Sequence, residues 1–241
     1  MTSSLSRLAP GRSMARAALC CCALVLAACG NQPPAPDWAL NAESAADRAT
    51  QAYLRGDQRV QALEWGKARG EVERTASPQL LARLALMRCA VEVASLEWNG
   101  CAEFTAVAED ADPPEQAYAR YLQAQPLSAQ DIALLPAAQQ PVARALQSAQ
   151  GDASAALAAV KLVQAPLSRL VAAAVVLRAR GPADALLAEA VDTAAAQGWR
   201  RPLLAWLLLR VQQARTAGNE VLAQALERRV RVLQGQAGAT P

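Results

Sequence analysis

The scarcity of strand-forming residues between positions 37 and 234 constrains the fold more than any other feature of the sequence. Roughly a quarter of the chain is alanine, Ile132 is its only isoleucine, and leucine, arginine, glutamine and glutamate fill most other positions. These are good helix formers, whereas the β-branched residues that favour strands are few. No window alternates apolar and polar residues over a useful length. The sequence therefore predicts an all-α fold.

Helix-breaking residues divide this region into segments of ordinary helix length. Glycines stand where helices commonly end in left-handed geometry, at Gly56, Gly151, Gly181, Gly198 and Gly218. The expected N-caps are Asp57, Asp152 and Asn219, and the prolines expected in first turns are Pro78, Pro166, Pro182 and Pro202. We expect helices over residues 39–55, 57–75, 78–96, 102–110, 114–124, 128–135, 139–149, 152–164, 166–180, 182–197, 200–217 and 219–234.

Apolar residues recur at helical spacing on three of these segments. The three stripes are Leu80, Leu84, Met87 and Val91; Leu167, Leu170, Ala174 and Leu177; and Leu222, Leu226, Val230 and Leu233. Residues 202–209 are apolar throughout. We therefore expect that helix to be covered on most sides and to form the centre of the C-terminal half.

The first 28 residues have the pattern of a signal peptide. Arg12 and Arg16 precede an apolar run over residues 17–28, which is 12 residues long. A membrane-spanning helix needs about 20 apolar residues, so the run is typical of a signal sequence that is removed. Both Met1 and Met14 are possible starts, because Met14 also precedes a compact basic segment.

The end of this run, Leu26-Ala27-Ala28-Cys29-Gly30, resembles the lipobox of bacterial lipoproteins. The resemblance implies that the Cys29 thiol receives diacylglycerol, that the chain is cut before Cys29, and that the new amine is acylated with a fatty acid such as palmitate. Two or more acyl chains hold a protein stably on a membrane. Neither Gly30 nor Asn31 is the aspartate that resembles an inner-membrane retention signal. We therefore expect the periplasmic face of the outer membrane of a Gram-negative bacterium, although the inner membrane remains the alternative.

The segment that follows Cys29 is rich in proline. Pro33, Pro34 and Pro36 cannot continue a helix and favour extended geometry. Residues 29–37 are therefore predicted to form a short tether, which separates the lipid from a helical domain over residues 38–234. Residues 235–241 are predicted to be a disordered tail.

Part of the helical region resembles a tetratricopeptide unit. The segment Ala52-Tyr53-Leu54-Arg55-Gly56-Asp57, followed by Ala62, Leu63, Trp65 and Ala68, matches a helix-turn-helix core with small residues at the contact. Weaker echoes begin at Gly151-Asp152 and Gly218-Asn219, but a regular period of about 34 residues is absent. The resemblance implies antiparallel helical hairpins, stacked either as a tetratricopeptide-like α-solenoid or as a compact helical array.

Charge and composition disfavour several functional classes. Of the 24 basic residues, three (Arg7, Arg12 and Arg16) lie in the leader, which leaves 21 against 21 acidic residues. A neutral chain lacks the positive field that attracts nucleic acid, so we expect no nucleic-acid partner. The chain has no histidine, which removes histidine-dependent catalysis and imidazole metal ligation.

An acidic cluster surrounds Pro113-Pro114 and consists of Glu109, Asp110, Asp112 and Glu115. Carboxylates of this kind can bind calcium, but the glycine and spacing of an EF-hand loop are missing. The preferred interpretation is structural, with Asp112 capping a helix and Glu115 in its first turn. We expect no metal, no cofactor and no catalytic residues.

Two cysteines remain after Cys20, Cys21 and Cys22 leave with the leader and Cys29 carries lipid. These are Cys89 and Cys101, separated by the turn Trp98-Asn99-Gly100. Because the periplasm is oxidising, the sequence predicts a disulfide between them, with two buried free thiols as the alternative.

Trp199, Arg200 and Arg201 open a late helix and are the predicted partner-binding residues, since tryptophan and arginine are common at binding hot spots. The alternative is an exposed arginine-rich face with Trp199 packed at a helix junction. The functional prediction is a lipid-anchored periplasmic adaptor for another envelope protein, in outer-membrane assembly, piloting or regulation of cell-wall synthases. The alternative is an envelope enzyme or glycan-binding protein that acts on peptidoglycan.

Overall fold

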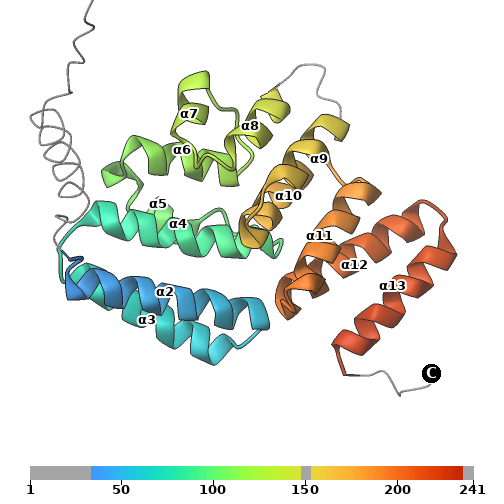
Figure 1. Ribbon diagram of the computed structural model, residues 1–241, viewed down its shortest axis with the longest axis horizontal. Helices are drawn as coiled ribbons and strands as arrows, with labels where there is room; N and C mark the ends of the chain where they lie inside the picture. The colour runs from blue at the N-terminus through green and yellow to red at the C-terminus, as the bar shows by residue number, and fades with distance from the viewer. Residues whose placement is uncertain (1–33, 148–152, 236–241) are drawn as a thin grey trace, which may run out of the picture. The chain divides into compact units, whose positions relative to one another are not determined.

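The computed structural model describes residues 34–147 and 153–235 (Figure 1). The predicted signal peptide, Cys29, the first part of the tether, Gly151, Asp152 and residues 236–241 lie outside this range. The described helices all belong to one compact unit that begins at Asp37.

The described residues form α-helices and one short 3-10 helix, with no strand, which confirms the all-α prediction. The helices are α2 (Asp37–Arg55), α3 (Gln58–Glu73), α4 (Pro78–Ala94), α5 (Ala102–Thr105), the 3-10 helix η2 (Ala108–Asp110), α6 (Pro113–Leu122), α7 (Ala129–Leu134), α8 (Gln140–Gln147), α9 (Ala153–Leu162), α10 (Pro166–Arg180), α11 (Asp184–Ala196), α12 (Arg200–Thr216) and α13 (Glu220–Leu233).

Most expected helix boundaries agree with these to within a few residues, and two differ. The single helix expected over residues 102–110 is instead α5 and η2, because the amide of Val107 donates to the carbonyl of Phe104 and closes a tight turn between them. Pro182 does not lie in a first turn. It precedes α11, which begins at Asp184, where an acidic side chain suits the positive end of the helix dipole.

The predicted Gly-Asp turn joins α2 and α3 as an antiparallel hairpin. Gly56 has a φ of +88°, a left-handed conformation that glycine adopts without strain, and Asp57 caps α3 by accepting from the amide of Val60 at 3.1 Å. The two helices meet through a separate small cluster of buried side chains, Ala45, Ala46, Ala49, Trp65 and Ala68. Alanine at this contact lets the helix backbones approach closely.

A similar turn joins α12 and α13. Gly218 has a φ of +71°, and the side chain of Asn219 accepts from the amide of Leu222 at 3.1 Å. The N-cap predicted at Asn219 is therefore confirmed.

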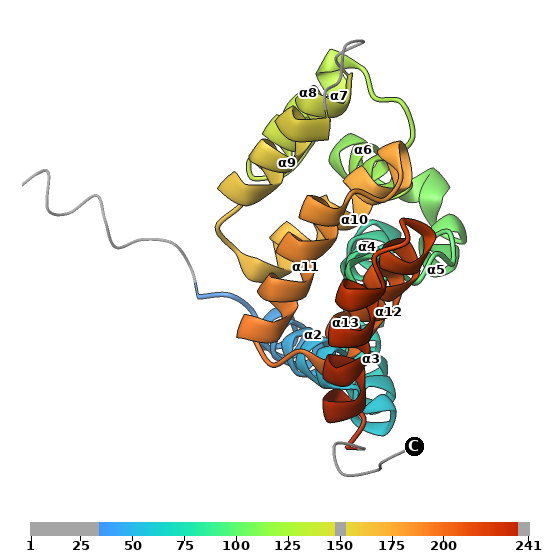
Figure 2. The same ribbon diagram turned by 90° about the vertical axis from the view of Figure 1, so that its right-hand side faces the viewer.

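The most completely buried helix is α10, and not α12, which was expected to be covered on most sides and to form the centre of the C-terminal half. Residues 170–176 are buried on every side of α10, because α4, α9 and α11 all pack against it (Figures 1 and 2). The helix α12 packs on α11, α13 and α2 but leaves Leu208 49% exposed. The prediction that Met87 lies on the buried face of α4 is also wrong. Met87 is exposed, whereas Leu86 and Cys89 are buried.

Contacts between helices far apart in sequence make the unit a compact array. In a solenoid each repeat touches only its neighbours. Here α4 packs against α10, and α2 packs against α12. The indole N–H of Trp206 on α12 donates to the carbonyl of Ala94 at the end of α4, at 3.0 Å. Of the two arrangements that the sequence left open, the described residues adopt the compact one.

A buried carboxylate in the first hairpin predicts a pH dependence of stability. Glu64 on α3 accepts from Lys67 Nζ at 2.6 Å and from Arg48 Nε at 2.8 Å. These hydrogen bonds, that of Lys67 first, lower the pKa of Glu64 below its ordinary value of 4.5. A depressed folded-state pKa stabilises the protein above the unfolded pKa, and this contribution is lost as the pH falls through the folded value.

We therefore expect Glu64→Gln to flatten the decline in the free energy of unfolding below a pH of about 4.5. Urea denaturation across this acidic range measures the slope. Glu73→Gln is the matched control, because Glu73 also pairs with an arginine, Arg69, but at an exposed position. If the free energy of unfolding fell equally steeply with pH in the wild type and in Glu64→Gln, Glu64 would not contribute to the pH dependence of stability.

Candidate functional site

The three predicted partner-binding residues do not form one exposed surface. Trp199 is only 9% exposed and packs in the main core at the start of α12. Arg200 is exposed. Arg201 is engaged within the protein, where its Nε donates to the carbonyl of Tyr53 at 3.1 Å and its Nη1 pairs with Glu97 at 2.9 Å.

Arg201 therefore joins the start of α12 to the end of α2 and to the segment after α4. Its guanidinium carbon lies 4.3 Å from the ring centroid of Tyr53, within the range of a cation–π contact. Burial raises the pKa of the Tyr53 hydroxyl well above its ordinary value, and the nearby charge of Glu97 adds to this effect. The burial of Trp199 agrees with the alternative interpretation, in which it packs at a helix junction.

The structure contains the predicted disulfide between Cys89 and Cys101. The sulfur atoms are 1.97 Å apart and the Cα atoms 5.2 Å apart. Both residues are buried, Cys89 on α4 and Cys101 immediately before α5. The bond closes the turn over residues 95–101 onto the helix that precedes it.

Polar contacts fix the same turn from its other side. Asn99 Nδ2 donates to Glu92 Oε2 at 2.7 Å, and Arg88 Nε donates to Glu92 Oε1 at 3.0 Å. Arg88 also pairs with Glu103 beyond the turn. This network, together with the disulfide, holds the backbone on both sides of Trp98.

Trp98 borders an open apolar groove, which we call the Trp98 groove. It has a volume of about 590 Å³ and is lined by Leu96, Trp98, Leu177, Arg178 and Leu209. Three elements contribute to it, namely the turn after α4, the last turns of α10 and the middle of α12. Trp98 is 42% exposed, and the guanidinium carbon of Arg178 lies 5.2 Å from the centroid of its ring.

Sequence reasoning missed this pair because its members are far apart in the chain. The residue types are those expected of a hot spot, as for Trp199 and its neighbours, but here both side chains are exposed. The sequence feature that could have identified Trp98 was its position inside a polar turn, next to Asn99-Gly100, where the core does not require a large aromatic side chain.

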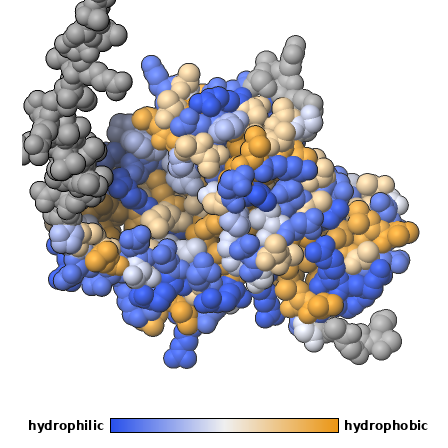
Figure 3. Space-filling view, viewed as in Figure 1, coloured by the Kyte–Doolittle hydropathy of each residue, from blue (hydrophilic) through white to orange (hydrophobic). Residues whose placement is uncertain are grey.

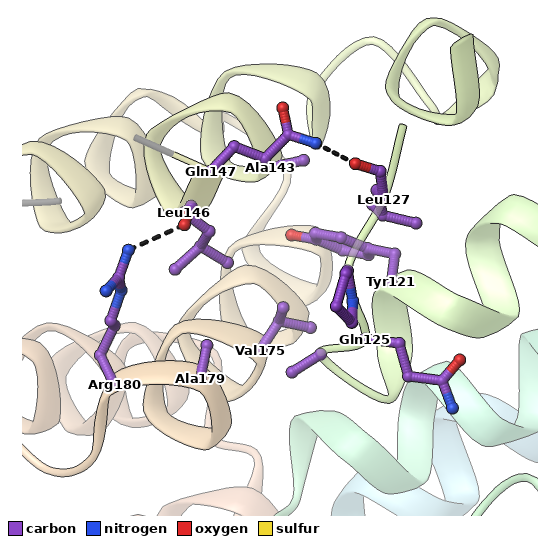
Figure 4. Close-up of a pocket in the computed structure, with 11 residues that line it drawn as sticks. Tyr121, Gln125, Leu127, Ala143, Leu146, Gln147, Val175, Ala179 and Arg180 are labelled. Atoms are coloured by element: carbon purple, nitrogen blue, oxygen red, sulfur yellow. Dashed lines mark hydrogen bonds between the residues drawn. The ribbon is translucent and has the colours of Figure 1, made fainter. Parts of the chain in front are cut away.

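A second hollow, the Tyr121 pocket, lies between α6, α8 and α10 (Figure 4). Its volume is about 390 Å³, and Leu146, Val175 and Ala179 contribute apolar walls. Hydrogen bonds join its edges, from Gln147 to the carbonyl of Leu127 and from Arg180 to the carbonyl of Leu146.

The hydroxyl of Tyr121 points to another partner, Gln139, which accepts at 2.7 Å. Burial raises the pKa of Tyr121 well above its ordinary value, so this hydroxyl stays protonated near neutral pH. The walls of the pocket are therefore apolar, and the amide of Gln147 and the guanidinium of Arg180 already form hydrogen bonds across its edges. None of the residues that line it provides an ionised nucleophile.

The predicted acidic cluster is dispersed. Glu109, Asp110 and Asp112 are exposed, whereas Glu115 accepts from Arg83 at 2.8 Å. Asp112 stands at the N-cap position of α6 but makes no capping hydrogen bond with its side chain. Within the described ranges, 34–147 and 153–235, no group of three or more cysteine or acidic residues is placed to hold a metal ion.

Comparisons of the chain with protein-family models, with curated proteins and with solved structures found no match. In the part of the chain that the structure describes, none of the helices has the length and apolar character needed to cross a membrane.

Proposed function

We propose that this protein is a lipid-anchored adaptor at the periplasmic face of the outer membrane, which binds another protein of the cell envelope. The observation that carries the proposal is the motif Leu26-Ala27-Ala28-Cys29 directly after a short apolar run with preceding arginines. A lipid on Cys29 and the proline-rich tether would hold the helical array close to the membrane surface.

Surface features of the array support the binding part of the proposal. Polar and apolar side chains are interspersed over the face shown in Figure 3. The Trp98 groove and the Tyr121 pocket both expose apolar walls edged by arginine, and aromatic and arginine side chains dominate binding hot spots. The proposed partners are proteins of outer-membrane assembly, of piloting, or of cell-wall synthase regulation.

Replacing Cys29 with serine should remove the protein from the outer-membrane fraction. Serine cannot form the thioether to diacylglycerol, so the precursor should stay uncut and unlipidated. Membrane fractionation and metabolic labelling with radioactive palmitate measure both effects. Cys22→Ser is the matched control, because Cys22 lies in the same apolar run and should leave processing intact. A Cys29→Ser protein of mature size in the outer membrane would contradict the proposal.

The choice between adaptor and enzyme is tested with purified peptidoglycan. The mature protein should release no soluble glycan or peptide fragments from isolated sacculi over prolonged incubation, as measured by chromatography. Release that persists after removal of contaminating hydrolases would instead establish the alternative, an enzyme acting on peptidoglycan.

A further inference from the structure

We infer that the Trp98 groove binds an acidic segment of a partner protein, with an apolar side chain in the groove and a carboxylate on Arg178. The inference rests on the proposed adaptor function and specifies the chemistry of the segment through which the partner binds.

The floor of the groove is apolar and is built from three separate elements. Leu96, Leu177 and Leu209 are partly buried and pack against the main core, so their inward sides are fixed while their outward sides remain accessible. A leucine or phenylalanine side chain entering the groove would lie against these leucines and Trp98. Removal of such apolar surface from water is the main source of affinity at protein interfaces.

Trp98 is held in place before any ligand arrives. Its turn is tied to α4 by the Cys89–Cys101 disulfide and by the hydrogen bond from Asn99 to Glu92. The amide of Glu97 also donates to the carbonyl of Glu92, at 3.0 Å. A side chain on a fixed turn loses little further freedom on binding, which favours affinity.

Arg178 provides a cation that no acidic side chain of the described residues neutralises. In contrast, Arg169 on the same helix pairs with Glu189, and Arg210 on α12 pairs with Asp184. The guanidinium carbon of Arg178 lies 5.2 Å from the centroid of the Trp98 ring, a cation–π contact that limits where the guanidinium can move. Its N–H groups can therefore donate in parallel to both oxygens of a carboxylate, the strongest geometry for this ion pair.

The charge of the chain favours a protein segment over a membrane surface. Without its leader the chain has 21 basic and 21 acidic residues, so no general attraction to anionic lipid is expected.

The experiment is a selection from a phage-displayed library of random 12-residue peptides on the immobilised, lipidated protein in detergent. We expect enrichment of peptides that place leucine or phenylalanine next to aspartate or glutamate. For an enriched peptide, Trp98→Ala should weaken binding at least 30-fold, about the effect of a hot-spot residue. Arg178→Glu should shift the selection towards lysine and arginine. Arg200→Glu is the matched control, because Arg200 is exposed but lies outside the groove.

The variant Trp98→Phe and the unfolding temperatures of all variants show whether weaker binding comes from the loss of the contact with the peptide or from unfolding of the protein. Phenylalanine keeps an aromatic face and should retain most of the affinity. Enrichment without acidic residues, or unchanged affinity in both groove variants, would overturn the inference. Flotation with phosphatidylglycerol vesicles that depends on Trp98 and Arg178 would assign the groove to the membrane instead, and dimerisation abolished by Arg178→Glu would assign it to a second copy.

These results separate the groove from the proposed function. If the lipid on Cys29 and a stable envelope partner are found but Trp98→Ala and Arg178→Glu bind that partner like wild type, the groove inference alone fails. If the protein carries no lipid, the proposed anchoring fails whatever the peptide selection shows.

Discussion

Replacing Trp206 with alanine should lower the free energy of unfolding by about 3 to 5 kcal/mol, the usual cost of removing a large buried aromatic side chain. Trp206 is fully buried on α12. Its indole N–H donates to the carbonyl of Ala94 at the end of α4, so the substitution also deprives a buried carbonyl of its donor. Urea denaturation measures the change.

Two variants identify the source of this loss. Trp206→Phe removes the hydrogen bond while keeping much of the volume, so it should fall between wild type and Trp206→Ala. Leu208→Ala lies on the same helix at an exposed position and should cost less than about 1 kcal/mol. A loss below about 1 kcal/mol in Trp206→Ala would contradict the burial of Trp206 and its hydrogen bond to the end of α4.

Reduction of the Cys89–Cys101 disulfide should lower the free energy of unfolding by about 3 kcal/mol, because the bond closes a loop of about 13 residues and restricts the unfolded chain. For a domain of this size the melting temperature should fall by on the order of 10 °C. Calorimetry with and without a phosphine reductant measures the shift, after alkylation of the unfolded protein confirms that the bond was intact.

The double variant Cys89→Ala/Cys101→Ala gives the matched comparison. It should melt near the temperature of the reduced wild type and should not respond to the reductant. Complete alkylation of both thiols in the native protein without reductant would show that the cysteines are not paired. An unchanged melting temperature after verified reduction would show that the bond does not stabilise the fold.

The helices and their ends were predictable because their causes are local. Gly56 and Gly218 end helices by adopting left-handed geometry, and Asp57 and Asn219 cap helices through residues three positions away. The cysteine pair was predictable for the same reason, since a short turn brings Cys101 back to α4.

The packing of the helices was not predictable from such local patterns. Residues 202–209 and residues 170–176 are similarly apolar, and the packing of α4, α9 and α11 around α10 makes α10 the buried centre. The candidate site shows the same limit. Trp199 and Trp98 both neighbour polar residues in sequence, yet the fold buries the first and exposes the second beside Arg178, a residue from a distant helix.

The most direct test of the proposed anchoring is the mass of the N-terminal tryptic peptide of the protein purified from cell membranes. The proposal predicts a peptide of residues 29–48, whose first residue is Cys29 with diacylglycerol on the thiol and a fatty acid on the amine. A peptide of residues 17–48 with an unmodified Cys29 would show that the chain is neither cut nor lipidated there. That result would contradict the lipid-anchored adaptor.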